Sequence, residues 1–113
     1  MQIPEDYKQF REELELISEK NRYKILLTLF AGNKEFSFSQ LKEILPSIQE
    51  NKLNYHLKIL KENGLITNRK KENYKRSENR SFYSLSNKAI ELLKQLGLGK
   101  VQKEFHNLLK KMT

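Results

Sequence analysis

The chain carries the sequence LNYHLKILKENGLI at residues 53–66, and this stretch decides the fold. Leu53, Leu57 and Leu60 recur at helical spacing with polar residues between them, which predicts a helix with one buried face and one polar face. Gly64 is a typical helix stop, and the two apolar residues after it begin a run that predicts a strand. Such a helix directs its polar side chains outward.

The segment that follows, RKKENYKRSENR at residues 69–80, holds six basic and two acidic residues. It lies between residues 65–69 and residues 81–85, two short runs with the alternation of β-strands. The sequence therefore predicts a hairpin whose tip is polar and positively charged.

The distribution of charge along the chain points to an anionic partner. The formal net charge is +8, and basic and acidic residues balance over residues 1–68. Residues 69–80 contribute +4, and residues 88–113, with six lysines and two glutamates, contribute another +4. An excess gathered in two patches favours binding to a polyanion.

Composition restricts the class of protein. At 113 residues we expect a single domain over residues 1–113. No apolar run approaches the roughly 20 residues of a membrane helix and no signal peptide is apparent, so we expect a cytoplasmic protein, located at the nucleoid and without a membrane partner. The absence of cysteine excludes disulfides, thiolate metal sites and thiol switches.

Catalysis finds no support in the sequence. The chain has two histidines and no cysteine, and it lacks a glycine-rich phosphate loop and an H-E-x-x-H motif. We expect a protein that is not an enzyme and that uses no cofactor and no metal.

Further helices are predicted before the 53–66 stretch. Pro4 can open a first helix, and Ser18 can cap a second helix that is apolar nearly all round and ends at Gly32. Residues 35–38 alternate like a short strand.

Two more caps define the middle of the chain. Ser37 or Ser39 can cap a brief helix that Pro46 ends. Ser47-Ile48-Gln49-Glu50 has the S-x-x-E form of a capping box, so the next helix is expected from Ser47 to Asn63. These two helices form a helix-turn-helix.

After the hairpin, Ser86 can cap a helix that starts at Asn87. Gly97 and Gly99 are expected to bend or break this helix before a second amphipathic stretch. The predicted fold class is mainly α with a small β-hairpin (α+β).

This order of elements and several of its segments resemble the ArsR-like bacterial and archaeal transcriptional regulators. The resemblance covers about residues 15 to 96 and is carried by residues 18–26 (SEKNRYKIL), 53–60 with 62–66, and 82–86 (FYSLS). MarR-like regulators and a further group of archaeal regulators use similar segments. The resemblance implies a winged helix-turn-helix with N- and C-terminal dimerisation helices at residues 1–17 and 97–113.

The resemblance also bears on inducer sensing. The resemblance aligns Ser37 and Ser39 of this chain with the cysteine pair of thiolate-sensing ArsR-like regulators, so that metal site is absent. Other members place aspartate and histidine ligands on the terminal helix, where this chain offers only His106. A regulator without a bound inducer is therefore expected.

DNA-contacting residues are expected on the polar helix face and in the basic segment. Asn and Gln can pair with adenine, Lys can reach guanine or phosphate, and Tyr can touch a thymine methyl or a phosphate. Clustered wing cations can neutralise phosphates, and an arginine or a tyrosine at the tip could enter the minor groove. The expected contacts are Gln49, Asn51, Lys52, Asn54, Tyr55 and Lys58 in the helix, and Arg69, Lys70, Lys71, Tyr74, Lys75, Arg76 and Arg80 in the wing.

Two residues of the same helix have structural interpretations instead. His56 is expected to be partly buried and hydrogen-bonded beside Leu57 and Leu60. Glu50 is expected to complete the capping box.

Two apolar stripes predict a homodimer. The expected interface residues are Tyr7, Phe10, Leu14 and Ile17 near the N-terminus, and Val101, Phe105, Leu108 and Met112 near the C-terminus. A two-fold dimer would hold its recognition helices about 34 Å apart, as a palindromic site requires. The alternative is that both stripes pack within the monomer.

The sequence thus predicts a homodimeric, sequence-specific regulator of transcription that binds double-stranded DNA. Residues 47–63 would enter the major groove, and the wing 69–80 would contact phosphates or the minor groove. The alternatives are a sequence-tolerant architectural protein of the nucleoid, a protein-interaction module and RNA as the nucleic-acid partner.

Overall fold

The computed structural model describes residues 5–74 and 78–112, apart from the side chains of residues 5, 6, 71–74, 78–80, 101, 105 and 112. The elements follow the predicted order, mainly helical with a small antiparallel sheet, which confirms the fold class. They are α1 (Glu5–Ser18), α2 (Lys20–Gly32), β1 (Phe36–Ser37), α3 (Phe38–Ile44), α4 (Glu50–Glu62), β2 (Ile66–Tyr74), β3 (Glu78–Leu85), α5 (Asn87–Gln95) and α6 (Gly99–Met112).

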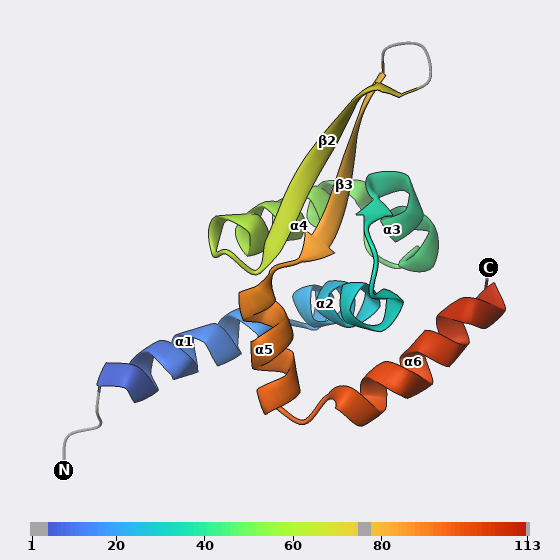
Figure 1. The fold of residues 1–113 in the computed structure, drawn as a ribbon. Helices are drawn as coiled ribbons and strands as arrows, with labels where there is room; N and C mark the ends of the chain where they lie inside the picture. The colour runs from blue at the N-terminus through green and yellow to red at the C-terminus, as the bar shows by residue number, and fades with distance from the viewer. Residues whose placement is uncertain (1–4, 75–77, 113) are drawn as a thin grey trace.

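Helix α2 lies at the centre of the molecule (Figure 1). Strands β2 and β3 form a ribbon that projects from the helical body, and α3 and α4 flank its base. Helix α6 packs against α2, while α1 extends away from the body toward the N-terminus. The hairpin and the two terminal helices therefore occupy opposite sides of the molecule. Among the described residues, no helix has the length and apolar character needed to cross a membrane.

The core is built around α2, as its nearly continuous apolar sequence predicts. Thr28 is also fully buried, and its hydroxyl donates to the carbonyl of Lys24 at 2.8 Å, so its burial leaves no polar group unpaired. Apolar side chains from α2 and from the surrounding elements form the core, among them Ile25, Leu26, Leu29 and Phe30 of α2, Leu41 of α3, Leu53, Leu57 and Leu60 of α4, Leu65 and Ile66 near the hairpin, and Leu92 and Leu93 of α5.

The sheet has the order β1-β3-β2. Phe36 pairs with Tyr83, and Ile66 pairs with Leu85 in antiparallel register. Both hairpin strands are longer than predicted, because β2 continues to Tyr74 and β3 begins at Glu78. Most of the basic segment is thus part of the ribbon itself, and the predicted strand bounds of 65–69 and 81–85 are too short.

Two of the predicted helix caps are wrong. Glu19, and not Ser18, caps α2, because its carboxylate accepts the backbone N–H groups of Asn21 and Arg22 at 3.0 and 2.9 Å. Helix α4 begins at Glu50, three residues later than expected, and its N-cap residue Gln49 makes no side-chain cap bond.

Tertiary packing explains why α4 begins later than predicted. Ile48 is buried and its backbone N–H donates to the carbonyl of Leu45, so residues 46–48 form a turn instead of helix. Glu50 pairs with Lys42 at 3.1 Å and does not complete a capping box. A capping box forms instead at α3, between Ser37 and Gln40. Ser37 is one of the two residues predicted to cap that helix.

The predicted glycine breaks are confirmed. Gly64 and Gly97 adopt positive φ angles of 72° and 76°, and each follows the end of a helix, α4 and α5 respectively. Ser86 caps α5 by accepting the N–H of Ala89. Gly97 separates α5 from α6, which then returns along α2.

Helix α6 is joined to α2 by two side chains. The Gln102 amide donates to the carbonyl of Phe30 at 2.9 Å, and the His106 ring donates through Nδ1 to the carbonyl of Ala31 at 2.6 Å. Both carbonyls belong to the last turn of α2, where a helix has no backbone donors of its own. His106 therefore has a structural role.

Candidate nucleic-acid interface

Helix α4 separates its apolar and polar residues cleanly. Leu53, Leu57 and Leu60 are buried against the core, together with His56. The outward face carries exposed side chains at all the predicted helix positions, namely Gln49, Asn51, Lys52, Asn54, Tyr55 and Lys58. The α4 face, defined by these six residues, is polar and accessible from end to end.

A partly buried polar network lies on the inner side of α4. The Arg22 guanidinium lies with Nη1 3.2 Å from Nδ1 of His56, and Glu19 Oε2 lies 3.6 Å from the same nitrogen. Because the guanidinium can only donate, Nδ1 accepts and the imidazole is neutral. His56 is 7% exposed and hydrogen-bonded, as predicted.

The electrostatics agree with a neutral His56. Burial lowers the pKa of the imidazole, and the charges of Arg22 and Lys52 lower it further, against the opposing effect of Glu19. Burial alone would raise the pKa of Glu19, but hydrogen bonds from the backbone of Asn21 and Arg22 hold it below its usual value. His56 therefore accepts a hydrogen bond from Arg22 and does not form a full ion pair with Glu19.

The largest side chain on the α4 face is Tyr55, which is 57% exposed. Its ring stands edge-on to His56, with ring centroids 5.1 Å apart and an interplanar angle of 67°. Lys58 pairs only at 4.0 Å with the exposed Glu62, which is a weak interaction. The face thus offers amides, ammonium groups and a phenol that solvent or a ligand can reach.

In the hairpin, the structure separates two neighbouring cations. Lys70 is exposed. The guanidinium of Arg69 instead donates twice to Glu35, from Nε at 3.0 Å and from Nη2 at 2.6 Å, and these bonds raise the pKa of Arg69 further above its usual value. Arg69 is therefore paired with Glu35 at the base of the hairpin while its side chain stays exposed, and its contact with DNA remains a prediction.

The other wing candidates are described only in part. Lys71 and Arg80 occupy paired register positions across β2 and β3, and Tyr74 pairs with Glu78. The side chains of Lys71, Tyr74 and Arg80, and the whole of Lys75 and Arg76, lie outside the described residues.

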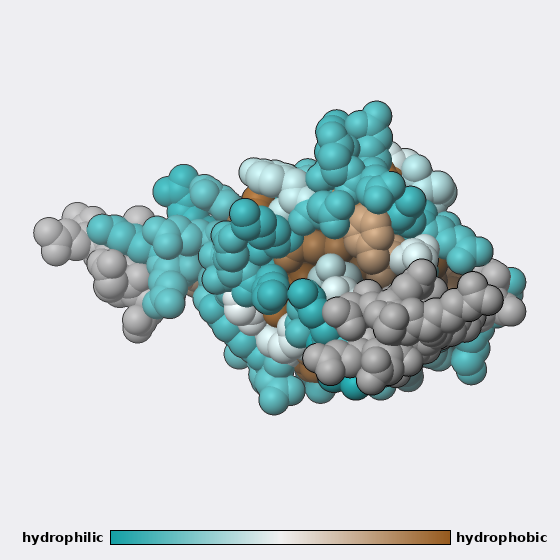
Figure 2. Space-filling view, turned by 90° about the horizontal axis from the view of Figure 1, so that it is seen from above, coloured by the Kyte–Doolittle hydropathy of each residue, from teal (hydrophilic) through white to brown (hydrophobic). Residues whose placement is uncertain are grey.

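The face that carries the hairpin is mainly hydrophilic. Seen from above in Figure 2, hydrophilic residues surround a smaller hydrophobic hollow near the centre. Within the part of the chain that the structure describes, no group of three or more metal-ligating side chains is present. The hydrophilic residues of this face thus offer groups that can form hydrogen bonds.

The predicted dimer stripes divide between surface and core. Tyr7 is 64% exposed and Phe10 is 40% exposed, whereas Leu14 is half-buried. Ile17 is only 4% exposed and belongs to the monomer core, so its assignment to a dimer interface is wrong. In α6, Leu108 is 55% exposed, and the side chains of Val101, Phe105 and Met112 lie outside the described residues.

Arg22 and Glu19 are the residues that the sequence analysis did not identify as part of this site. Arg22 lies on α2 and Glu19 is the N-cap residue of that helix, 34 and 37 positions before His56, and only the packing of α2 on α4 brings them to the imidazole. No local pattern in the sequence marks such a contact.

The helix-turn-helix region and the fold of this chain are similar to those of known proteins. Residues 17–69, from the end of α1 into β2, match the family described as "Helix-turn-helix domain". No curated protein sequence matches the chain. The HlyU transcriptional regulator of Vibrio vulnificus is 26% identical, with a TM-score of 0.61 over 81% of this chain and 92% of that protein.

Two further solved structures cover the whole of this chain. A protein from Halomicrobium mukohataei with a GntR superfamily winged-helix-turn-helix domain has a TM-score of 0.85 at 17% identity, over 81% of its own length. A MarR-family regulator described from Enterococcus faecalis has a TM-score of 0.71 at 18% identity, over 97% of its length. The ArsR-like subtype remains a prediction, since the matched proteins carry GntR, HlyU and MarR descriptions.

Proposed function

We propose that this winged helix-turn-helix protein is a homodimeric transcriptional regulator that binds double-stranded DNA with sequence specificity. The matched helix-turn-helix region and the regulators of the same fold support the DNA-binding class. In this proposal, α4 lies in the major groove and the hairpin contacts phosphates or the minor groove.

The observation that carries the proposal is the division of α4 into two faces. Its buried side is held by leucines and by the Arg22–His56 hydrogen bond, so the outward side chains start from a fixed backbone. Asn51 and Asn54 have the amide groups that pair with adenine, and Lys52 and Lys58 have ammonium groups that suit guanine or phosphate. A rigid helix with these exposed groups is suited to reading base edges.

The hairpin supports the same orientation of the protein on DNA. Lys70 is exposed on β2, and Lys71 and Arg80 share a register position further along the ribbon. Basic residues gathered on one projecting ribbon favour contact with the phosphates beside a groove. Lys75 and Arg76 remain wing candidates on the evidence of the sequence alone.

Exposed apolar side chains on α1 and α6 support the homodimer. Tyr7, Phe10 and Leu108 are large and exposed, and a two-fold interface would cover them. Leu14, Val101, Phe105 and Met112 complete the proposed interface, from which Ile17 is removed.

A second candidate function is sequence-tolerant, architectural binding of DNA. The α6 segment favours it, because Lys100, Lys103, Lys110 and Lys111 add positive charge on a helix that is not part of the α4 face. Such a protein would bind through phosphates with little reading of bases.

Selection of bound duplexes from a random pool distinguishes the two functions. The selection should use excess nonspecific competitor at about 0.15 M salt, where nonspecific binding is weakened. Enrichment of a palindrome with half-sites about one helical turn apart is the expected result. Retained binding without an enriched motif would favour the architectural function, and no binding to any duplex would contradict both and direct attention to RNA or protein partners.

A further inference from the structure

A groove of about 660 Å³ lies beside the turn of the helix-turn-helix. Its walls come from three parts of the chain: α2, the end of α3 with the turn that follows it, and the last two turns of α6. The volume is in the range of about 300–1,000 Å³ that is typical of small-molecule sites.

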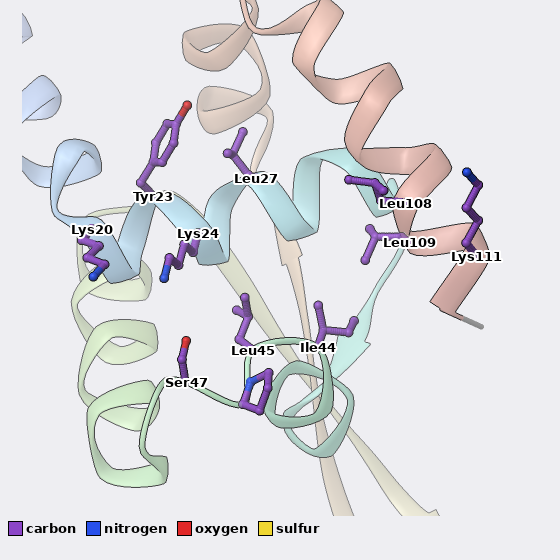
Figure 3. A pocket seen from close by; sticks show the side chains of 11 residues that line it. Lys20, Tyr23, Lys24, Leu27, Ile44, Leu45, Ser47, Leu108, Leu109 and Lys111 are labelled. Carbon is purple, nitrogen blue, oxygen red and sulfur yellow. The ribbon is translucent and has the colours of Figure 1, made fainter.

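The walls of the groove are almost entirely apolar. Leu27 reaches it from α2, Ile44 and Leu45 from the end of α3, and Leu108 and Leu109 from α6 (Figure 3). Leu27 is half-buried and is not one of the residues packed against the core cluster. Aliphatic side chains from separate elements therefore face a common space.

The charged groups around the groove all have one sign. Lys20, Lys24 and Lys111 are among its lining residues, and no carboxylate is. Lys20 and Lys24 are four residues apart, on the same face of α2, and lie on the side of the groove nearest Ser47, whereas Lys111 lies beyond the leucines of α6. Among the described residues, no ion pair joins these three lysines to an acidic side chain.

We propose that this groove binds a single-chain aliphatic carboxylate, with the chain against the leucines and the carboxylate beside Lys20 and Lys24. The apolar walls exclude a polar ligand, since its groups would lose water without gaining partners. The paired ammonium groups favour a negative head group at one end. The Ser47 hydroxyl lies at that same end and can donate to a carboxylate oxygen.

The position of the groove gives such a ligand access to the helix-turn-helix. Pro46 and Ser47 line the groove and belong to the turn that leads into α4. A ligand held there contacts the connection between α3 and α4 as well as α6. An effect of the ligand on DNA affinity would rest on the proposed function, whereas binding of the ligand to the groove would not.

Isothermal titration calorimetry with dodecanoate, below its micelle concentration and without DNA, tests the binding itself. We expect saturable binding of one dodecanoate per chain. Dodecyltrimethylammonium, which has the same chain with the opposite charge, should bind more weakly, and acetate, which lacks the chain, should not bind detectably.

Two sets of variants test the location. Lys20→Gln with Lys24→Gln should weaken dodecanoate binding about fivefold, as expected for loss of two charge pairs at the groove surface, one from the exposed Lys20 and one from the half-buried Lys24. Lys8→Gln with Lys100→Gln removes the same charge from exposed positions outside the groove and should have no effect. Leu27→Gln should weaken binding about tenfold through lost apolar contact, whereas Leu27→Met should preserve it.

Several outcomes would overturn the proposal. Equal binding of the cationic amphiphile would show that the lysines do not select the head group. Unchanged affinity in the Lys20 and Lys24 variant would do the same. Absence of dodecanoate binding would contradict the proposal. Leu108 also belongs to the proposed dimer interface, so binding only at dilutions where the protein is monomeric would assign the groove to contacts between copies of the chain instead.

Discussion

Arg22 and His56 are joined across the interface between α2 and α4, with Nη1 of the guanidinium 3.2 Å from Nδ1 of the imidazole. The same arginine donates through Nε to the carbonyl of Leu16, and its backbone N–H donates to Glu19. One side chain thus connects the end of α1 to the buried side of the proposed recognition helix. The orientation of α4 depends on polar contacts as well as on its leucines.

The first prediction concerns the stability of the protein as a function of pH. The pKa of His56 is lowered by burial in the folded state, so below about pH 6.5 the unfolded chain binds this proton more readily. The contribution of His56 to stability is therefore complete above that pH and is lost on acidification. Urea unfolding of the wild type and of His56→Gln between about pH 7.5 and 5.5 should show the steeper loss in the wild type. Parallel curves would contradict this assignment.

The second prediction distinguishes the two candidate caps of α2. Glu19→Ala should lower the free energy of unfolding by about 1 kcal/mol, because the backbone N–H groups of Asn21 and Arg22 lose their acceptor. Ser18→Ala should change it by less than about 0.5 kcal/mol, as for an ordinary surface substitution. Glu12→Ala, on the exposed face of α1, is the matched control for loss of a carboxylate. Thermal unfolding of the three variants measures the difference, and the reverse order would restore Ser18 as the cap.

The third prediction compares neighbouring hairpin cations. Lys70→Ala should reduce the slope of log affinity against log salt by about 0.9, the value for one lost phosphate contact on B-DNA. Arg69→Ala should alter the slope less, because Glu35 already neutralises this guanidinium. Fluorescence anisotropy on a single duplex at several salt concentrations provides the slopes. A larger effect for Arg69 would mean that the pair with Glu35 opens on DNA.

The fourth prediction concerns base reading by α4. Asn54→Ala should remove about 1–3 kcal/mol of discrimination at one base pair of the selected site, while binding to unrelated duplexes changes little. Competition assays with singly substituted duplexes would identify that position. Asn107→Ala, an exposed asparagine on α6, should leave the pattern unchanged. If both variants discriminate like the wild type, Asn54 does not read a base.

The fifth prediction addresses the homodimer. Phe10→Glu places a charge on the exposed apolar stripe of α1 and should shift the protein to a monomer at micromolar concentration, as measured by sedimentation velocity. Gln9→Glu adds the same charge to the neighbouring exposed residue and should leave the dimer intact. A monomeric wild type, or a dimeric Phe10→Glu variant, would remove α1 from the interface.

Local patterns were sufficient to predict the faces and the ends of several helices. The spacing of Leu53, Leu57 and Leu60 identified the buried side of α4, and Gly64 marked its end because the chain there requires a positive φ. Ser86 was recognised as a cap because its hydroxyl needs only a neighbouring backbone N–H.

Long-range packing accounts for the predictions that were wrong. The motif at Ser47–Glu50 has the form of a capping box, but burial of Ile48 draws the backbone into a turn there. Ile17 continues the apolar stripe of α1, yet it lies where that helix meets the core. Periodicity identifies an apolar face without identifying the element that covers it, and it cannot foresee that Glu35 engages Arg69.

The two hydrogen bonds from Gln102 and His106 to the last turn of α2 have a consequence for assembly. Through them α6 caps the C-terminal end of α2, with donors that lie 72 and 75 residues further along the chain than the carbonyls. Lifting α6 away would leave two carbonyls without donors, at roughly 1–3 kcal/mol for each that stayed buried. A dimer that displaced α6 from α2 without replacing it is thereby disfavoured, so we expect a dimer to form on surfaces that leave these two bonds in place.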